Sequence, residues 1–372
     1  MIRFYSVFLC SYLAATVLHA QTHSHGRTIQ FPDVPGYLTL TCDFHQHTVF
    51  SDGDVWPNIR VQEAVKDSVD AISLTEHLEY QPHSDDMPHP DRNRSYEIAE
   101  KAARPYTLLV IRGAEITRDM PPGHNNAIFI QDANKLRIEA PVPVFEEANR
   151  QGAFVFWNHP DWIAQREDGI ARLTPMHEEL IRRNLLHGIE VVNDLTYSEE
   201  ALQIALDKNL TIMATSDIHG LIDWQYKVAE GGHRPVTLVF AKERTPASIK
   251  EALFERRTVA WYNNLLVGRP EHLNPLLQAC LRVEKARYIG PSSVCEVVVY
   301  NDSDADFLLF SEGPYSLQMF AGVIELPAHA RTTIPVKTLE VKDSFELNFK
   351  VLNAVTAPGV HPELKWEVKP GQ

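Results

Sequence analysis

The feature that most constrains the fold is a regular alternation of short apolar, β-prone runs with helical patterns between residues 37 and 256. The first run, Tyr37 to Cys42, precedes a helical pattern from Pro57 to Ser68, and the next run begins at Val69. Such alternation with short connections is typical of a parallel sheet or barrel. Six of the runs end in His, Asp, Glu or Asn, and barrel enzymes carry their chemistry at the C-terminal ends of strands. The pattern predicts an α/β barrel of about seven strands with a polar site at one edge.

The character of the chain changes beyond Trp261. Residues from about 280 to 372 alternate between β-prone runs and turns, without a helical pattern, which predicts a small β-sandwich. This region has no cluster of metal-ligating residues, so a packing or substrate-gating role is expected of it. We assign residues 37–270 to the barrel, residues 280–372 to the β-sandwich domain, and residues 21–36 to a polar lead-in.

Residues 1–20 have the features of a secretory signal peptide. Arg3 precedes an apolar stretch from Phe4 to Leu18, which is too short and too interrupted for a stable membrane span. We therefore expect an exported, periplasmic or secreted protein with no membrane span. Removal of the signal leaves three cysteines, and their spacing leaves open whether the last two form a disulfide: Cys42, Cys280 and Cys295.

Composition excludes several classes of function. A formal net charge of −14 argues against a surface that coats nucleic acid, because phosphate backbones favour Lys/Arg-rich faces. Neither a Gly-rich nucleotide loop nor a Gly-X-Ser-X-Gly elbow occurs, which disfavours P-loop and serine-hydrolase mechanisms. The sequence does not indicate an oligomeric state.

The polar residues at the strand ends form a set rich in imidazoles and carboxylates. His45 and His47 lie two apart on a predicted strand and project to the same face, and Asp52 follows on a turn. This mixture suits zinc, manganese or iron, whereas a thiolate site would need more cysteines. Nine such groups are too many for one ion and fit two or three divalent ions. They are His45, His47, Asp52, His77, Glu115, His124, His159, Asp217 and His219.

The motifs that carry these residues resemble those of the PHP (polymerase and histidinol phosphatase) superfamily of metal-dependent phosphoesterases. The resemblance spans roughly residues 38 to 268, and the motifs arrive in the family's order. It implies a distorted (β/α)7 TIM-like barrel with a di- or trinuclear metal site. The motifs are His45-Gln46-His47, Ser51-Asp52-Gly53, Thr75-Glu76-His77, Gly113-Ala114-Glu115, His159-Pro160 and Ser216-Asp217-Ile218-His219.

The resemblance also implies a role for each ligand, with Glu115 shared by every ion. The other ligands are His45, His47 and Asp217 for the first ion, Asp52, His77 and His159 for the second, and His124 and His219 for the third. Glu115, Asp217 and His219 are expected to act in catalysis. Glu76 stands where the family usually has Asp, and we expect it to orient a histidine.

Basic residues near these motifs are candidates for contacts with a phosphate. Arg118, just past the Glu115 strand, is the first candidate, and His83 lies in a Pro-rich loop that follows His77. The remaining candidates are Arg112, Arg166, Lys227, His233 and Arg234.

Within the superfamily, the chain resembles the secreted Sb-PDE-type phosphodiesterases through its signal sequence, Phe156–Pro160, His233–Phe240 and the C-terminal β domain. The resemblance implies hydrolysis of a small phosphodiester to a monoester and an alcohol by a metal-bridging hydroxide. One alternative is a phosphomonoesterase of the histidinol-phosphatase kind. Another is a non-catalytic metal-holding module whose β domain binds a glycan or protein. Export and net charge disfavour a third, proofreading associated with a DNA polymerase.

Overall fold

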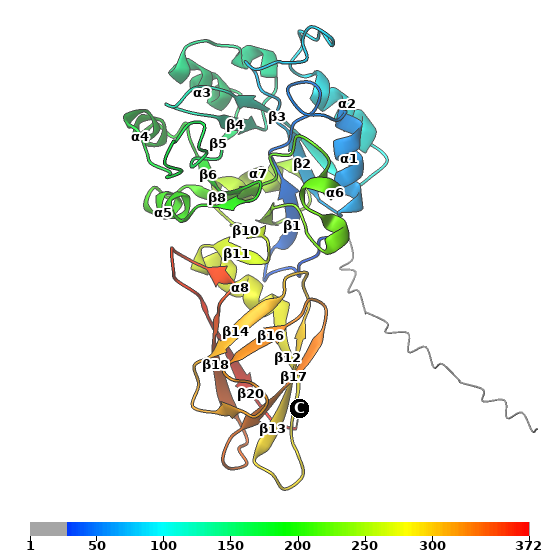
Figure 1. The fold of residues 1–372 in the computed structure, drawn as a ribbon, viewed down its shortest axis with the longest axis vertical. Helices are drawn as coiled ribbons and strands as arrows, with labels where there is room; N and C mark the ends of the chain where they lie inside the picture. Colours follow the sequence, from blue (N-terminus) through cyan, green and yellow to red (C-terminus); the bar gives the residue numbers. More distant parts are fainter. Residues whose placement is uncertain (1–27, 372) are drawn as a thin grey trace, which may run out of the picture.

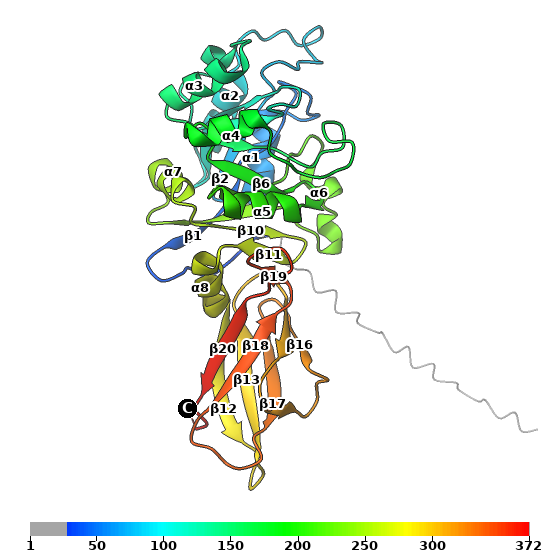
Figure 2. The same ribbon diagram turned by 90° about the vertical axis from the view of Figure 1, so that its left-hand side faces the viewer.

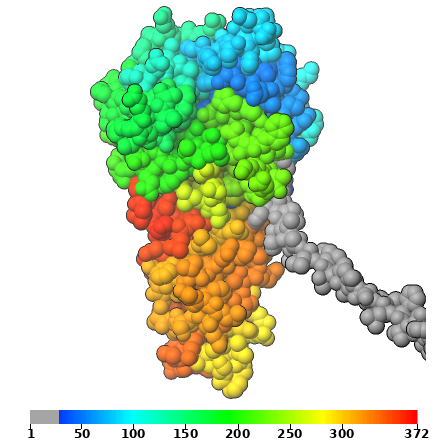
Figure 3. Space-filling model, viewed as in Figure 1, coloured from blue at the N-terminus to red at the C-terminus, as the bar shows by residue number. Residues whose placement is uncertain are grey.

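The computed structural model describes residues 28–371, so the expected signal peptide and the first part of the expected lead-in, residues 21–27, lie outside the described residues. The described chain forms two bodies stacked end to end, a larger one of helices around a curled sheet and a smaller one of strands (Figure 1). The space-filling view shows the same division, with a broad upper body and a narrower lower one (Figure 3). Between residues 28 and 371, no helix combines the length and apolar character that a bilayer crossing requires.

The larger body is built on one twelve-stranded sheet. Its strand order is β19-β11-β10-β9-β1-β2-β3-β4-β5-β6-β7, with β8 paired to β6. The strands are β1 (Leu38–Asp43), β2 (Ala71–Leu74), β3 (Leu109–Ile116), β4 (Asn125–Ile128), β5 (Phe154–Trp157), β6 (Gly188–Asn193), β7 (Thr196–Tyr197), β8 (Thr211–Thr215), β9 (Val236–Ala241), β10 (Thr258–Tyr262), β11 (Leu265–Gly268) and β19 (Ala354–Val355).

Helices pack around the outside of this sheet (Figure 2). Several have side-chain caps, because Thr174, Ser198 and Thr245 accept hydrogen bonds from the first-turn backbone of α4, α5 and α7. The helices are α1 (Pro57–Lys66), α2 (Arg94–Ala103), α3 (Pro141–Arg150), α4 (Pro175–Arg182), α5 (Glu199–Asp207), α6 (Ile222–Gln225), α7 (Pro246–Phe254) and α8 (Pro270–Cys280), with short 3-10 turns η1 (Ala133–Leu136) and η2 (Val228–Glu230).

The sheet is mixed, whereas strand–helix alternation alone indicates a parallel one. β1, β2 and β3 are parallel, and so are β5, β6 and β8. β4 runs antiparallel to β3 and β5, and β9 runs antiparallel to β1 and β10. For β3 and β4 the reason is the length of their connection, because no helix separates the two strands and a parallel pair needs a crossover of about a dozen residues or more.

Threonine side chains join β8 to its neighbours across the closure of the sheet. The Thr237 hydroxyl on β9 accepts a hydrogen bond from the Ala214 N–H (2.9 Å) and donates one to the Ala214 carbonyl (2.8 Å). The Thr258 hydroxyl on β10 donates to the Ile212 carbonyl over 2.8 Å. These buried bonds take the place of a backbone ladder, and the curled sheet confirms the expected distorted TIM-like barrel.

The smaller body is a sandwich of two four-stranded sheets, ordered β12-β13-β17-β15 and β16-β14-β18-β20. Buried and more exposed residues alternate along β13 and β20, as expected where one face packs on a core and the other meets solvent. The sandwich thus confirms the expected C-terminal β domain. Its strands are β12 (Leu281–Tyr288), β13 (Val294–Asn301), β14 (Phe307–Ser311), β15 (Ser316–Leu317), β16 (Val323–Leu326), β17 (Arg331–Lys337), β18 (Phe345–Val351) and β20 (Glu363–Val368).

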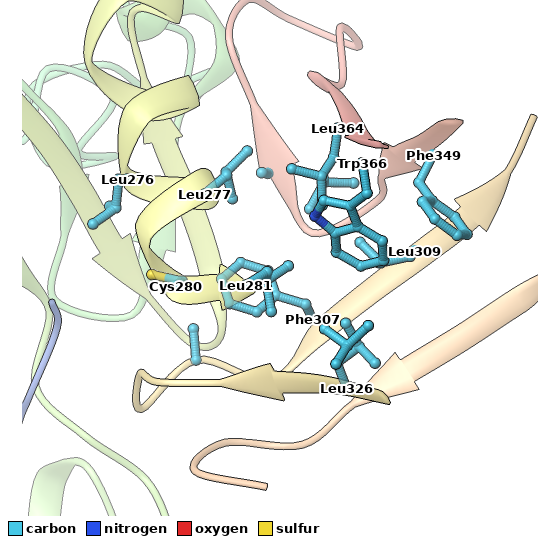
Figure 4. Close-up of a cluster of buried hydrophobic side chains, with 14 of the residues drawn as sticks. Leu276, Leu277, Cys280, Leu281, Phe307, Leu309, Leu326, Phe349, Leu364 and Trp366 are labelled. Carbon is cyan, nitrogen blue, oxygen red and sulfur yellow. The ribbon is translucent and has the colours of Figure 1, made fainter. Parts of the chain in front are cut away.

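One hydrophobic core runs through both bodies. Leu277 and Leu281, on and just after α8, belong to the same buried cluster as Phe307 and Trp366 of the sandwich (Figure 4). That cluster continues into β9–β11 of the barrel, and β19 leaves the sandwich to pair with β11. Cys280 and Cys295 are both free thiols. The sandwich is therefore packed against the barrel as part of one core.

Arg234, a sequence candidate for phosphate contact, is instead an internal support. Its fully buried guanidinium bonds Asp67 at the end of α1 (2.6 Å) and Asp43 at the end of β1 (3.3 Å). Asp43 also accepts hydrogen bonds from the Ser216 backbone N–H (3.0 Å) and hydroxyl (2.7 Å), just past β8. The arginine reaches no solvent and ties α1 to the strand that leads into the His45 motif.

We predict that Arg234→Ala lowers the free energy of unfolding by about 3–5 kcal/mol, because it leaves Asp43 and Asp67 buried with one cation fewer. Urea denaturation of the metal-free protein would measure this. Arg287→Ala is the matched control, since Arg287 pairs with Glu296 on the exposed face of the sandwich (3.0 Å) and should matter little. Equal effects of the two variants would contradict the role given to Arg234.

Candidate metal centre

All nine ligand candidates lie at one edge of the barrel, at or just beyond the ends of its strands. The ends of β1 and β8 are joined there by backbone hydrogen bonds, from Asp217 N–H to the His45 carbonyl (2.8 Å) and from His47 N–H to the Ile218 carbonyl (3.0 Å). A backbone β-bridge joins His77, just beyond β2, to Glu115 on β3. Strands separated in sequence therefore deliver their imidazoles and carboxylates to one place.

The first group of ligand atoms is fully formed. The Nε2 atoms of His45 and His47 lie 3.0 Å apart, and each is 3.1 Å from Oδ1 of Asp217. Oε2 of Glu115 lies 3.1 Å from Nε2 of His45 and 3.3 Å from Nε2 of His47. Donor atoms bound to one zinc-sized ion lie about 3.0–3.4 Å apart, as follows from metal–ligand bonds of about 2.1 Å. These four residues match the set that the family resemblance implies for the first ion.

A second group gathers around Asp52. Its Oδ2 lies 3.3 Å from Nε2 of His77 and its Oδ1 lies 3.2 Å from Nε2 of His219. Together with His47, these residues have ligand atoms within 4.8 Å of one another. The resemblance instead assigns His219 to a set with Glu115 and His124. The structure places His219 with Asp52 because the chain after Asp217 runs back beside the turn that carries Asp52.

A third group consists of His77, Glu115 and His124. Nδ1 of His124 lies 2.6 Å from Oε1 of Glu115, so the two carboxylate oxygens face different groups. The His159 ring lies 4.9 Å from that of His124 and 6.1 Å from that of His45. His159 is thus a neighbour of His124, whereas the resemblance assigns it to a set with Asp52 and His77.

The donor set fits divalent cations. Two imidazole nitrogens 3.0 Å apart cannot both present lone pairs to each other without a proton or a cation between them. Nδ1 of His159 is buried and has no hydrogen-bond partner among the described residues. A buried ring nitrogen without a partner is costly unless it binds an ion. Imidazole and carboxylate donors are those that zinc, manganese and iron accept.

Burial and charged neighbours shift the pKa values of several residues in the cluster. Although burial raises the pKa of a carboxyl group, hydrogen bonds from His219 and His77 hold the pKa of Asp52 well below its ordinary value. Burial lowers the pKa of His77, but the charges of Glu115 and Asp52 outweigh it and raise this pKa to about 11. Burial lowers the pKa of His159 to about 4, which leaves its ring neutral. A cation that binds here must displace protons from His77, so its affinity should fall as the pH falls.

A comparison with solved structures identifies the family. A two-domain protein from Bacteroides vulgatus, described as containing a predicted PHP-like metal-dependent phosphoesterase, shares 42% identity over 92% of this chain and 98% of its own, with a TM-score of 0.86. This chain belongs to the PHP-like metal-dependent phosphoesterases. The family resemblance of the sequence is therefore confirmed, and the cluster of imidazoles and carboxylates fits the metal site that such a phosphoesterase requires.

Other comparisons are weaker. A structure from Bifidobacterium adolescentis, to which metal-dependent phosphoesterase activity is attributed, shares 16% identity over 50% of this chain and 89% of its own, with a TM-score of 0.39. An amidohydrolase from Chromobacterium violaceum shares 14% over 48% of this chain and 87% of its own, with a TM-score of 0.35. TM-scores this low support no conclusion about this chain. A family model for an Ig-like domain matches residues 281–367, and the search of curated proteins returned no match.

Glu190 supports the PHP metal centre, although sequence reasoning missed it. This fully buried residue on β6 accepts a hydrogen bond from Nδ1 of His45 (2.8 Å) and another from the His159 backbone N–H (2.7 Å). It also accepts from the Thr215 hydroxyl (2.6 Å). Holding the proton on Nδ1 of His45 turns the Nε2 lone pair toward the other ligands. A glutamate within the otherwise apolar run Gly188–Val192 was the available signal.

Arg60 is a second support that the sequence did not reveal. It lies on the inner face of α1, and its guanidinium donates to the carbonyls of His47 (2.9 Å), His219 (2.7 Å) and Gly220 (2.7 Å). Glu63 pairs with it over 2.8 Å. One buried side chain thus fixes the backbones of both the β1 and β8 ligand loops. Its position among the apolar residues of α1 is the only sequence signal.

Glu76 lies where it can orient a histidine, as expected, but it acts through an intervening serine. Its carboxylate accepts hydrogen bonds from the Thr48 hydroxyl (2.5 Å) and N–H (3.1 Å) and from the Ser51 hydroxyl (2.6 Å). Ser51 in turn lies 3.3 Å from Nδ1 of His47. Glu76 therefore holds the turn that follows His47 and reaches that histidine only through Ser51.

The basic residues proposed for substrate contact are mostly engaged elsewhere. Nη2 of Arg118 bonds Glu79 (2.8 Å) and the Ile138 carbonyl (2.6 Å). His83 is half-buried in the loop after His77, and no contact between it and the ligand cluster occurs among the described residues. Both assignments stay predictions. Arg112 stacks on Tyr96, and the Arg166 side chain donates to the Arg172 carbonyl over 2.6 Å.

Lys227, His233 and Arg234 line a separate cavity of about 500 Å³. None of the nine metal-ligand candidates lines it. Its walls come from the loops after β6 and β8, from the β10–β11 turn and from Asp304 and Asp306 of the sandwich. The His233 ring stacks on Trp261 there at 3.5 Å. Lys227 and His233 therefore face the junction of the two bodies, whereas Arg234 borders the cavity with its guanidinium turned inward to Asp43 and Asp67.

We predict that Glu190→Gln weakens divalent-metal binding by about 10–100-fold, because the amide nitrogen would face either the His45 Nδ1–H or the His159 N–H. Metal content after dialysis against a graded chelator series would measure this. Glu243→Gln, at an exposed site beyond β9, is the matched control. Retention of metal by the Glu190 variant at the level of the control would refute the role assigned to Glu190.

Proposed function

We propose that this phosphoesterase hydrolyses phosphodiesters to a monoester and an alcohol, with two or three zinc, manganese or iron ions as cofactors. We further propose that it works outside the cytoplasm, after removal of residues 1–20. The resemblance of its motifs to secreted phosphodiesterases supports both parts. The substrate would be a small phosphate ester, since the acidic chain does not favour nucleic-acid surfaces.

The observation that carries the proposal concerns the charges around the centre. Within residues 28–371, every ion-pair partner of Asp52, Glu115 and Asp217 is a histidine. No lysine or arginine of the described residues is paired with these three carboxylates, so bound ions would supply the positive charge at the centre. A monoester dianion, which forms with a second pKa of about 6, would need more of that charge than a diester. A diester carries a single negative charge. A centre whose positive charge comes from its bound ions alone is better matched to the diester.

The side chains have distinct roles in this reaction. Bound divalent cations would lower the pKa of a water and neutralise charge that develops on the phosphoryl oxygens. Glu115 is fully buried and directs its two oxygens to different ligand groups, which holds those groups at a fixed spacing. His219 is the most exposed ligand, with 39% of its side chain accessible. Its Nδ1–H donates to the Asp217 carbonyl (2.8 Å), so Nε2 faces the site.

The proposal predicts that the metal-loaded protein cleaves bis(4-nitrophenyl) phosphate with a kcat/KM at least about tenfold above that for 4-nitrophenyl phosphate. Glu115→Gln should lower both activities by about a thousandfold or more, since a shared ligand is lost. Far-UV circular dichroism should show an unchanged fold. Glu139→Gln, at an exposed site, is the control and should keep full activity.

Other outcomes favour the alternatives. A clear preference for the monoester would support a phosphatase of the histidinol-phosphatase kind. Stoichiometric metal without cleavage of either ester would support a non-catalytic metal-holding module. Undiminished activity of the Glu115→Gln variant would refute the assignment of the site itself.

A further inference from the structure

Two exposed aromatic side chains stand beside different histidines of the metal centre. Tyr80 is 53% exposed, and its ring centroid lies 5.8 Å from that of His77. Trp162 is 44% exposed, with centroid distances of 5.0 Å to His159 and 5.6 Å to His124. Large apolar side chains left in solvent next to a polar site are characteristic of binding surfaces.

Both rings belong to loops whose first residues are held by backbone hydrogen bonds. Tyr80 comes three residues after His77, where the Leu78 N–H donates to the Glu115 carbonyl (3.0 Å). Trp162 comes three residues after His159 in a turn closed by its own N–H to the His159 carbonyl (3.0 Å). The Trp162 carbonyl accepts the N–H groups of Gln165 (2.9 Å) and Arg166 (2.8 Å). The rings are therefore held at the metal centre by its own ligand segments.

The two rings contact different histidines of the ligand cluster. Tyr80 contacts His77, Trp162 contacts His124 and His159, and the His77 and His124 rings lie 5.5 Å apart. A phosphate held by these histidines and their ions would have two separate aromatic rings beside it. A phosphodiester has two organic substituents that leave the phosphorus in different directions. A monoester has only one.

We propose that Tyr80 and Trp162 bind the two organic substituents of the phosphodiester, and that each substituent presents a flat ring face. The inference rests on the proposed phosphodiesterase function and adds the substrate class, a diester with ring-bearing groups on both sides. Aromatic side chains favour such groups because ring faces stack with geometric preference and without a need for charge. The same chemistry serves an aryl ring or a nucleobase.

Three phosphodiesters test whether a ring is recognised and which kind of ring is preferred. Each has one 4-nitrophenyl group, and the second substituent is a methyl, a phenyl or a thymidine 5′ group. We expect wild-type kcat/KM to be at least about tenfold higher for the phenyl or thymidine diester than for the methyl diester, from the usual strength of ring stacking. A higher kcat/KM for the phenyl diester would indicate an aryl substituent, and a higher kcat/KM for the thymidine diester would indicate a nucleoside. The 4-nitrophenyl leaving group occupies one ring in all three diesters, so the variant Trp162→Ala or Tyr80→Ala that removes the ring beside the second substituent should reduce this ratio, chiefly through KM. The other single variant should lower kcat/KM for all three diesters alike, and the double variant should also lose the ratio.

Controls separate substrate binding from structural support. Trp162→Phe should restore most of the ratio, and Tyr106→Ala should leave it unchanged, because Tyr106 is 49% exposed between α2 and β3. Metal content should be equal in all variants. A ratio near one in the wild type, or equal losses on all three diesters with loss of metal, would overturn the inference while leaving diester hydrolysis intact. A wild type that cleaves no diester would refute the proposed function itself.

Discussion

The metal centre depends on the junction between the ends of β1 and β8. Residues about 170 positions apart in the chain pair there through two backbone hydrogen bonds, and an isolated bridge joins Gln46 to Ile218 just beyond the two strands. His45 and His47 stand on one side of this bridge, and Asp217 and His219 stand on the other. If the junction opens, four ligands separate at once. The remainder of the barrel holds this contact in place.

Two buried arginines stabilise the junction between the ends of β1 and β8. Arg60 gathers the carbonyls of both ligand loops, while Arg234 joins Asp43 to Asp67. Buried cations are tolerated because each is satisfied by several acceptors, and loss of one partner is costly. The ligand loops are therefore held mainly by backbone acceptors and internal ion pairs. This explains how irregular loops can present side chains at distances suited to shared ions.

The sequence predicts the ligands well because they depend on local patterns. His45-Gln46-His47 lies on a strand end, and strand ends of a barrel meet at one edge whatever the details of the loops. The grouping of ligands could not be predicted in the same way. His219 joins Asp52 because of the path of two loops, and strand periodicity carries no information about such paths. Glu190 and Arg60 were missed for a related reason, since a buried charge within an apolar run has meaning only when its partners are known.

The count of charges links the geometry to the reaction. The cluster contains three carboxylates, from Asp52, Glu115 and Asp217, and six imidazoles that are neutral when they bind ions. Two divalent ions would leave these nine ligands with a net charge of +1, and three would leave +3, and a bridging hydroxide would lower each value by one. Under the proposed function, each added ion raises the positive charge that faces the phosphate, so a third ion would favour a dianionic monoester over a diester. The group around Asp52, which His219 completes at the most exposed side, is the group whose filling would change this balance. The position of His219 therefore bears on ester preference as well as on metal binding.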